Sequence, residues 1–423
     1  MVLTRLLIPE MFGLMAVVNM LIFGLHLISD VGLPQNLIQS KRGNDKVFVD
    51  TVWSMQILRG VLMALLALFL AVGVYLLGQA NYWPADVVYA NAQLPYLIVV
   101  CASVAVIDGF ISTNVAMANR NLNLGRISVL EFTGQIVGIV AMVGFAFVHK
   151  SVWALVAGSF CSSVARVILS HTIFPGAKNR FRLDRSSIRE IFHFGQWMFL
   201  SSILGFLASG GDRLILGGLV SAQVLGLYSV AFFIVGAVQE VFSKIMSSVA
   251  FPVLSEVMRD RPHDLKKTYY KFRLYFDIPI LFATGLLFTS GHWLIDFFYD
   301  ERYRYAGYML SILSVGLFES RYGLAGQCYL AMGKPKFLVV VIVCRVVALF
   351  VAMPLAFAAY GLEGALWVAG TSVLATLPVT FFYKIKYQFF DWRRELMVLP
   401  CLALGYGVGL IVNWSVYALG IAR

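Results

Sequence analysis

Long apolar stretches alternate with short polar loops along almost the whole chain. Twelve of these stretches have membrane-spanning length, close to the ~20 residues that cross a ~30 Å hydrocarbon core as a helix. They lie at 11–33, 51–77, 92–117, 127–148, 151–173, 193–217, 225–249, 274–297, 307–331, 337–359, 363–383 and 397–420. Because lipid offers the backbone no hydrogen-bond partner, such runs predict helices. The pattern therefore predicts an all-α, polytopic membrane protein.

The composition agrees with that class. Hydrophobic residues make up 60% of the 423 residues, charged residues only 13%, and the mean hydropathy is +0.81. This leaves too little polar surface for a soluble globule. The five cysteines lie inside predicted spans at irregular spacing, which is typical of small buried residues and not of a disulfide framework. No histidine spacing indicates a metal site, and no motif indicates a cofactor.

The net charge of +11 is distributed unevenly between the loops. The loops after the odd-numbered spans hold 22 lysines and arginines, whereas the other loops and the two termini together hold 5. Cytoplasmic loops carry such an excess. We therefore predict that loops 34–50, 174–192 and 250–273 are cytoplasmic and that loop 78–91 is external. The positive charge is then a topology signal and predicts no nucleic-acid partner.

The chain also matches itself at an offset near 213 residues. The aligned segments are 12–17 with 225–230, 154–159 with 366–371, and Ala118 with Ala331. An even number of spans separates the two copies, so we predict a duplication into parallel repeats related by an axis along the membrane normal.

The duplication predicts a domain organisation. The predicted parts are an N-terminal lobe of five spans at 1–173, a basic cytoplasmic linker at 174–192, a C-terminal lobe of six spans at 193–383, and an additional span within 384–423. The first half holds one span fewer than the second. We therefore expect that the first helix of the repeat is missing from this chain.

Several segments resemble those of Wzx-type polysaccharide flippases of the MOP exporter superfamily. They are 6–14, 29–38, 211–217, 225–231 and 251–255, and their motif residues include Asp30, Gly32, Asp212 and Arg213. The order and spacing of the segments carry the resemblance, more than any one of them. The chain departs from the family pattern at the first helix, and in having one span instead of two after the twelfth family helix.

The resemblance implies a fold and a function. Members of this flippase family have two six-helix lobes around a central cavity and lie in the bacterial inner membrane. They flip undecaprenyl-diphosphate-linked oligosaccharide from the cytoplasmic to the outer leaflet by alternating access. The implied partners are the lipid-linked oligosaccharide and membrane lipids, with polysaccharide polymerase and chain-length machinery as further candidates.

Charged residues deep in the predicted spans are the candidate functional residues, because each costs roughly 2.5–3.5 kcal/mol at a helix centre on insertion scales. The cavity candidates are Arg59, Arg321, Arg345, Asp108, Glu240 and Lys244. A guanidinium presents a fixed fork of donors to phosphate oxygens. We therefore expect Arg59 and Arg321 to line the cavity and bind the diphosphate.

The alternative for these residues is pairing with a nearby opposite charge. Glu240 and Lys244 are four residues apart on one predicted helix, a spacing that favours an ion pair. Asp108 and Arg321 occupy equivalent positions of the two repeats. Two alternatives follow: the two residues form a salt bridge between the lobes, or each pairs with a partner in its own lobe.

Other functions stay open from the sequence alone. A multidrug exporter of the same superfamily would use acids in its N-terminal lobe and a more apolar cavity, whereas the deep arginines favour an anionic lipid-linked sugar. A membrane-embedded polysaccharide-biosynthesis enzyme generally needs a large external catalytic loop or an Asp-x-Asp motif, and the sequence contains neither, so we expect no enzyme. The missing helix leaves an inactive truncated remnant as a further alternative.

Overall fold

The computed structural model of the chain describes residues 6–29, 33, 37, 42, 45–80, 82–84, 86–120, 123–174, 176, 178–332, 334 and 336–418. Within these residues the regular structure is entirely helical, with no strand. Eight of the helices are long and apolar enough to cross a membrane, and further apolar helices are shorter or interrupted. The prediction of an all-α, polytopic membrane fold is confirmed.

The chain divides into two compact units. The N-terminal unit falls within residues 2–206 and 217–222, and the C-terminal unit within 207–216 and 223–423. The lobe and linker boundaries that the repeat suggested stay a prediction. Two of the family-motif residues, Asp30 and Gly32, lie outside the described residues.

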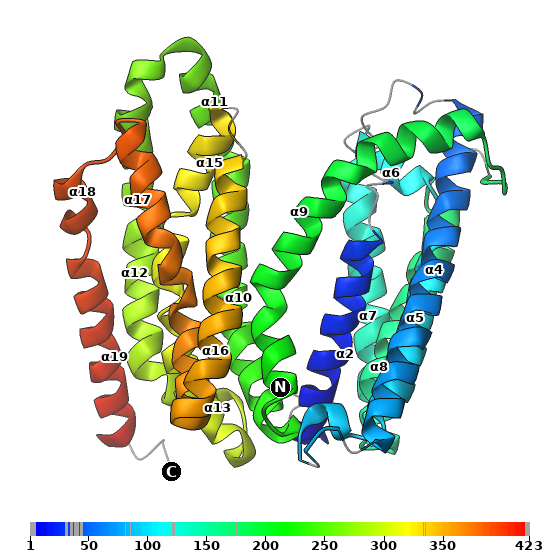
Figure 1. Cartoon of the computed structure of the whole chain (residues 1–423), viewed down its shortest axis with the longest axis horizontal. Coiled ribbons are helices and arrows are strands. Elements are labelled where there is room, and N and C mark those ends of the chain that lie inside the picture. Colours follow the sequence, from blue (N-terminus) through cyan, green and yellow to red (C-terminus); the bar gives the residue numbers. More distant parts are fainter. Residues whose placement is uncertain are drawn as a thin grey trace. The chain divides into compact units, whose positions relative to one another are not determined.

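The N-terminal unit is a bundle of helices (Figure 1). Its elements are α2 (Pro9–Ile28), α4 (Lys46–Gln79), η1 (Val88–Ala90), α5 (Leu94–Asp108), α6 (Asn114–Arg120), α7 (Leu124–Val148), α8 (Trp153–Thr172) and the first part of α9 (Arg185–Gly217). The Asp45 side chain starts α4 by accepting the Val47 N–H at 3.0 Å. The pairs α4 with α5 and α7 with α8 pack along their lengths.

The C-terminal unit is a second helical bundle. Its elements are α10 (Ala222–Ile245), η2 (Met246–Ala250), α11 (Phe251–Asp260), η3 (Pro262–Asp264), α12 (Leu265–Phe298), η4 (Glu301–Tyr303), α13 (Arg304–Ser314), α14 (Leu317–Ser320), α15 (Gly323–Ala331), α16 (Lys336–Thr371), η5 (Ser372–Thr376), α17 (Leu377–Lys386), α18 (Trp392–Met397) and α19 (Pro400–Ala418). Figure 1 shows α19 alongside α12. Gly405 and Gly409 of α19 lie so close to α12 that a Cβ at either position would collide with it. Small residues at such positions let two membrane helices approach each other closely.

Two predicted spans are interrupted, and a kink separates two others. The span predicted at 92–117 breaks between α5 and α6, and the span predicted at 307–331 breaks between α13 and α15. The element α16 consists of two helices that meet at Gly361, whose backbone is not helical, and Gly361 lies between the spans predicted at 337–359 and 363–383. Gly361 has φ +62°, a conformation that only glycine adopts readily.

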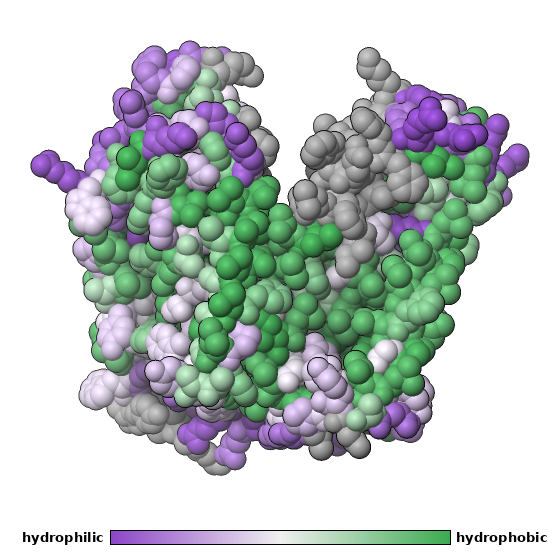
Figure 2. Space-filling model, in the orientation of Figure 1, coloured by the Kyte–Doolittle hydropathy of each residue, from purple (hydrophilic) through white to green (hydrophobic). Residues whose placement is uncertain are grey.

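The helix flanks are apolar and the helix ends are polar in both units. In Figure 2 hydrophobic residues cover the visible sides of the helices, and hydrophilic residues gather at their ends. Large apolar side chains such as Phe69 on α4, Val140 on α7 and Leu355 on α16 are exposed. Such surfaces suit a bilayer, where lipid tails take the place of water.

Candidate functional site

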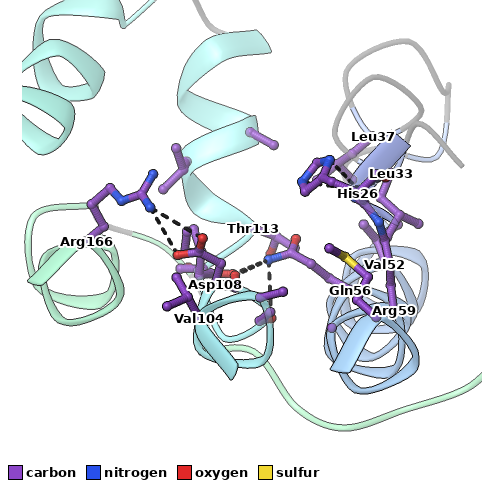
Figure 3. Close-up of a pocket in the computed structure, with 18 of the residues that line it drawn as sticks. His26, Leu33, Leu37, Val52, Gln56, Arg59, Val104, Asp108, Thr113 and Arg166 are labelled. Atoms are coloured by element: carbon purple, nitrogen blue, oxygen red, sulfur yellow. Dashed lines mark hydrogen bonds and ion pairs between the residues drawn. The ribbon is translucent and has the colours of Figure 1, made fainter. Parts of the chain in front are cut away.

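A pocket of about 440 Å³ lies within the N-terminal unit. Helices α2, α4, α5, α6, α7 and α8 all contribute to its lining. Most of the described lining residues are apolar, and three of them carry a formal charge: Arg59, Asp108 and Arg166 (Figure 3). A largely apolar pocket with a few convergent polar groups is the usual form of a ligand site.

One face of α4 forms a wall of the pocket. Its lining residues are Val52, Gln56, Arg59, Gly60 and Met63. These positions recur at three- and four-residue spacing, which places them along one side of a helix. Arg59, which the sequence singled out by its depth, therefore faces the pocket together with Gln56.

Groups at the C-terminal end of α2 contact the Arg59 guanidinium. Its Nη2 donates to the His26 carbonyl oxygen at 3.0 Å, and its Nε donates to Ser29 Oγ at 3.2 Å. The same Nη2 lies 3.0 and 3.3 Å from the two ring nitrogens of His26. A helix C-terminus carries partial negative charge and favours a cation nearby.

Asp108 lies on the other side of the pocket, at the end of α5 (Figure 3). It pairs with Arg166 Nη2 at 3.3 Å and accepts a hydrogen bond from Ser163 Oγ at 2.5 Å. Arg166 also lies 3.9 Å from Glu131. Asp108 is thus paired within its own unit.

Arg321 lies in a different environment, in the C-terminal unit. Only 1% of its side chain is exposed, and its Nη2 is 2.8 Å from Asp277 Oδ2 and 3.1 Å from the Glu395 carbonyl oxygen. Arg273 pairs with the same Asp277 oxygen at 2.8 Å, and both Arg273 and Lys384 contact the Glu395 carboxylate. We call these five residues the buried ion network. Its contacts match the alternative of pairing within a lobe.

Sequence reasoning did not identify the partners in this network. Arg273 and Lys384 counted only as loop charges, and Asp277 was not singled out. The spacing of Arg273 and Asp277, four residues apart, was an available signal for their ion pair. No local pattern marks Glu395, which meets Arg273 across 122 residues of chain.

The remaining candidates lie elsewhere in the C-terminal unit. Glu240 and Lys244 form the expected ion pair at 3.4 Å, on an exposed part of α10. Arg345, on α16, is partly buried and acts electrostatically on Glu319. Glu319 also accepts a hydrogen bond from Thr376 at 3.3 Å.

The motif residues Asp212 and Arg213 connect α9 to α10. Asp212 accepts a hydrogen bond from the Tyr228 hydroxyl and another from the Arg213 N–H, the latter at 2.8 Å. The Arg213 guanidinium lies 4.2 Å from the centre of the Phe232 ring. These contacts give the motif a packing role in this part of the fold.

Comparison with known proteins identifies the family. The model of a family described as polysaccharide biosynthesis protein matches residues 2–306. The chain belongs to this family. The lipopolysaccharide biosynthesis protein WzxC of Escherichia coli (strain K12) is 22% identical over 433 residues, which cover 97% of this chain and 83% of WzxC. The succinoglycan biosynthesis transport protein ExoT of Rhizobium meliloti (strain 1021) is 21% identical over 260 residues, 62% of this chain and 50% of ExoT.

Solved structures share the fold. An inward-facing multidrug resistance MATE family transporter of the MOP superfamily superposes with a TM-score of 0.68, at 14% identity, over 92% of both chains. The lipid II flippase MurJ, in an inward closed conformation, has a TM-score of 0.65 at 14% identity, over 95% of this chain and 86% of MurJ. The resemblance to Wzx-type proteins is confirmed, and the protein is a multi-pass membrane protein.

Proposed function

We propose that this family member transports undecaprenyl-diphosphate-linked oligosaccharide from the cytoplasmic to the outer leaflet for surface polysaccharide biosynthesis. The names of WzxC and ExoT connect relatives to polysaccharide biosynthesis and, for ExoT, to transport. MurJ, which shares the fold, is a lipid II flippase. Under this proposal the lipid-linked sugar and membrane lipids are direct partners, and the polymerase and chain-length machinery act on the exported product.

The placement of Arg59 in the pocket is the observation that carries the proposal. Its guanidinium contacts His26 and Ser29 on one wall, and Asp108 pairs with Arg166 on the other. A diphosphate would bring charged oxygens to Arg59, and each charge-assisted hydrogen bond contributes ~1.5–3 kcal/mol. We assign Arg59 to the diphosphate, with Asp108 and Arg166 forming the opposite wall.

The same placement disfavours the rival transport function. A multidrug exporter that takes organic cations would have to accept its substrate beside Arg59 and Arg166, and Asp108, the acid among the described lining residues, already pairs with Arg166. The MATE structure shares the fold with this chain, but a shared fold leaves the substrate open.

Replacement of Arg59 tests the proposal. In a host that lacks its own flippase, Arg59→Ala should lower surface polysaccharide about tenfold or more, since the loss of one charge-assisted bond removes ~1.5–3 kcal/mol. Arg59→Lys should restore export only in part, because an ammonium cannot reproduce the bidentate fork. Surface polysaccharide and membrane abundance are measured together.

The matched control is Arg302→Ala, which removes an arginine paired with Asp300 outside the predicted spans. Export should stay at the unsubstituted level in this variant. Normal export by Arg59→Ala at normal abundance would contradict the diphosphate site. Loss of the protein together with export would indicate a purely structural role for Arg59.

A further inference from the structure

Helix α18 lies in a basic loop, at the boundary of the last predicted span. It runs from Trp392 to Met397 and precedes α19, and Figure 1 shows it at the edge of the C-terminal unit. The loop 384–396 holds four lysines and arginines and belongs to the set predicted to be cytoplasmic. Because the last predicted span begins at residue 397, α18 lies near the level of the lipid headgroups.

The inward side of α18 is fixed to α12 and to the buried ion network. Its Glu395 is a member of that network and is 5% exposed. Just before the helix, the Asp391 N–H donates to the Tyr270 hydroxyl of α12 at 2.8 Å. Val398, which follows the helix, is also buried. These contacts decide which side of α18 faces away from the bundle.

The opposite side of α18 is largely apolar and exposed. At about 100° per residue, four residues of this side occupy an arc of about 140°, and Glu395 lies outside that arc. The four are Trp392, Arg393, Leu396 and Met397. The exposed fraction is 63% for Trp392, 42% for Leu396 and 74% for Met397. Three large apolar side chains of one short helix therefore lie uncovered by the part of the chain that the structure describes.

Basic side chains accompany the apolar ones. Arg393 is exposed, Arg394 lies 3.6 Å from Asp391, and Lys266 of α12 lies 3.7 Å from the same carboxylate. Asp391 thus offsets part of the positive charge. We call the α18 patch the three cations and the three exposed apolar residues together, which are Lys266, Arg393, Arg394, Trp392, Leu396 and Met397.

A bilayer surface supplies both kinds of contact that the α18 patch can make. Tryptophan, arginine and lysine are typical of helices that lie in the headgroup region with their apolar side chains at the acyl boundary. The phosphates of anionic lipids complement basic clusters next to a membrane span. The span that follows α18 places the bilayer beside the patch, whereas a soluble partner would have to compete with lipid there.

We propose that α18 is an interfacial helix whose patch binds anionic phospholipid of the cytoplasmic leaflet: Arg393 and Arg394 contact the headgroup phosphates, and Trp392 and Met397 enter the acyl boundary. The proposal goes beyond the proposed function, because it concerns the lipid around the protein and not the transported substrate. It is also independent of the pocket in the N-terminal unit.

Fluorescence quenching at a single position tests which lipid adjoins the patch. In a full-length variant without the five native cysteines, Met397→Cys carries a bimane label, and the protein is reconstituted in vesicles of phosphatidylcholine and phosphatidylglycerol. Quenching by spin-labelled phosphatidylglycerol is compared with quenching by spin-labelled phosphatidylcholine. Trp414→Cys, at a 74% exposed residue of α19, gives the same comparison at an ordinary lipid-facing position.

We expect phosphatidylglycerol to be preferred at position 397 and neither lipid at position 414. Arg393→Ala combined with Arg394→Ala should lower the preference about fivefold for each arginine removed, which is the usual contribution of one basic residue near an anionic surface. Arg393→Lys combined with Arg394→Lys should keep the preference, because the charge remains. High salt should weaken it, because salt screens charges at a surface.

Arg302→Ala combined with Arg304→Ala is the matched control. Both arginines follow the C-terminal end of α12, whereas α18 packs near its N-terminal end, so the preference at position 397 should not change. Equal quenching by the two lipids at position 397, or an unchanged preference without Arg393 and Arg394, would overturn the proposal. Quenching at position 414 but by neither lipid at position 397 would overturn it as well, and would indicate that protein covers the patch.

Discussion

At the scale of single residues, Glu395 is the centre of the buried ion network. Its carboxylate contacts Arg273 and Lys384 and accepts hydrogen bonds from the hydroxyls of Tyr270 at 3.0 Å and Tyr322 at 3.2 Å. It is 5% exposed, so these partners replace water almost completely. Three cations and two carboxylates share the network, and removal of one carboxylate would leave buried cations uncompensated.

We therefore expect Glu395→Gln to destabilise the protein by about 3–5 kcal/mol, the usual cost of breaking a buried ion pair from one side. Thermal unfolding in detergent measures the change. Adding Lys384→Met should recover part of the loss, because it removes one of the uncompensated cations. Glu301→Gln, at an exposed glutamate, is the control. An unchanged unfolding temperature for Glu395→Gln would show that the network contributes little to stability.

At the scale of elements, residues 178–184 form a strap on the start of α4. The N–H groups of Arg180, Arg182 and Asp184 donate to Asp50 Oδ1 at 3.1 Å, Ser54 Oγ at 2.8 Å and Thr51 Oγ1 at 3.2 Å. Alternate residues of the strap thus face α4, as in an extended chain. We predicted a linker in this region, and this part of it is hydrogen-bonded to the N-terminal unit.

The strap leads into α9 through Asp184. Its carboxylate accepts hydrogen bonds from the Ser186 hydroxyl and from the Ser187 hydroxyl and N–H. These bonds, that of Ser186 foremost, lower the pKa of Asp184 to about 2. Because the pKa is lowered in the folded protein, the stability that these bonds contribute is present above the ordinary pKa of an aspartate. This stability is lost only as the pH falls toward about 2. The junction is therefore insensitive to pH near neutrality.

Substitution of Asp50 tests the strap. Asp50→Ala removes the acceptor for the Arg180 N–H and the ion pair with Lys46 at 3.0 Å, so the strap should detach more often. Trypsin should then cut between residues 178 and 185 several-fold faster, since cleavage follows local opening. Glu256→Ala, at an exposed acid of α11, should leave the rate unchanged. Equal rates for both variants would mean that Asp50 does not hold the strap.

At the scale of the whole molecule, the two halves share an irregularity. The interruption after α5 lies at 109–113, and the region between α13 and α15 lies at 315–322. An offset of 213 carries 109–113 to 322–326, so the two regions adjoin and share only the pair Gly109 and Tyr322. Both regions lie in predicted spans that the repeat pairs with each other, 92–117 and 307–331.

The orientation in the membrane is open to a direct test. In a variant without the five native cysteines, Lys266→Cys should react with an impermeant maleimide only after the cells are permeabilised, because loop 250–273 is predicted to be cytoplasmic. Asp86→Cys, in the loop predicted to be external, should react in intact cells. Labelling at position 266 in intact cells would reverse the orientation and the proposed direction of transport.

The candidate site was predictable only in part. The depth of Arg59 and Asp108 in their spans marked both as candidates, and both line the pocket. Arg166 was not among the candidates and Gln56 carries no charge to mark it, yet both line the same pocket. Charge at depth is a local property of a sequence, whereas a side chain that supports another helix acts through a contact that spacing does not encode.

The sequence by itself determined the class of the protein, the approximate spans and the family. A long apolar run has few solutions in lipid other than a helix, so local composition suffices for these features. The tertiary structure decided where the spans break and which charges meet. Gln56 supports carbonyls 52 to 55 residues away and Arg321 meets Asp277 across 44, so these contacts exist only once the helices have packed.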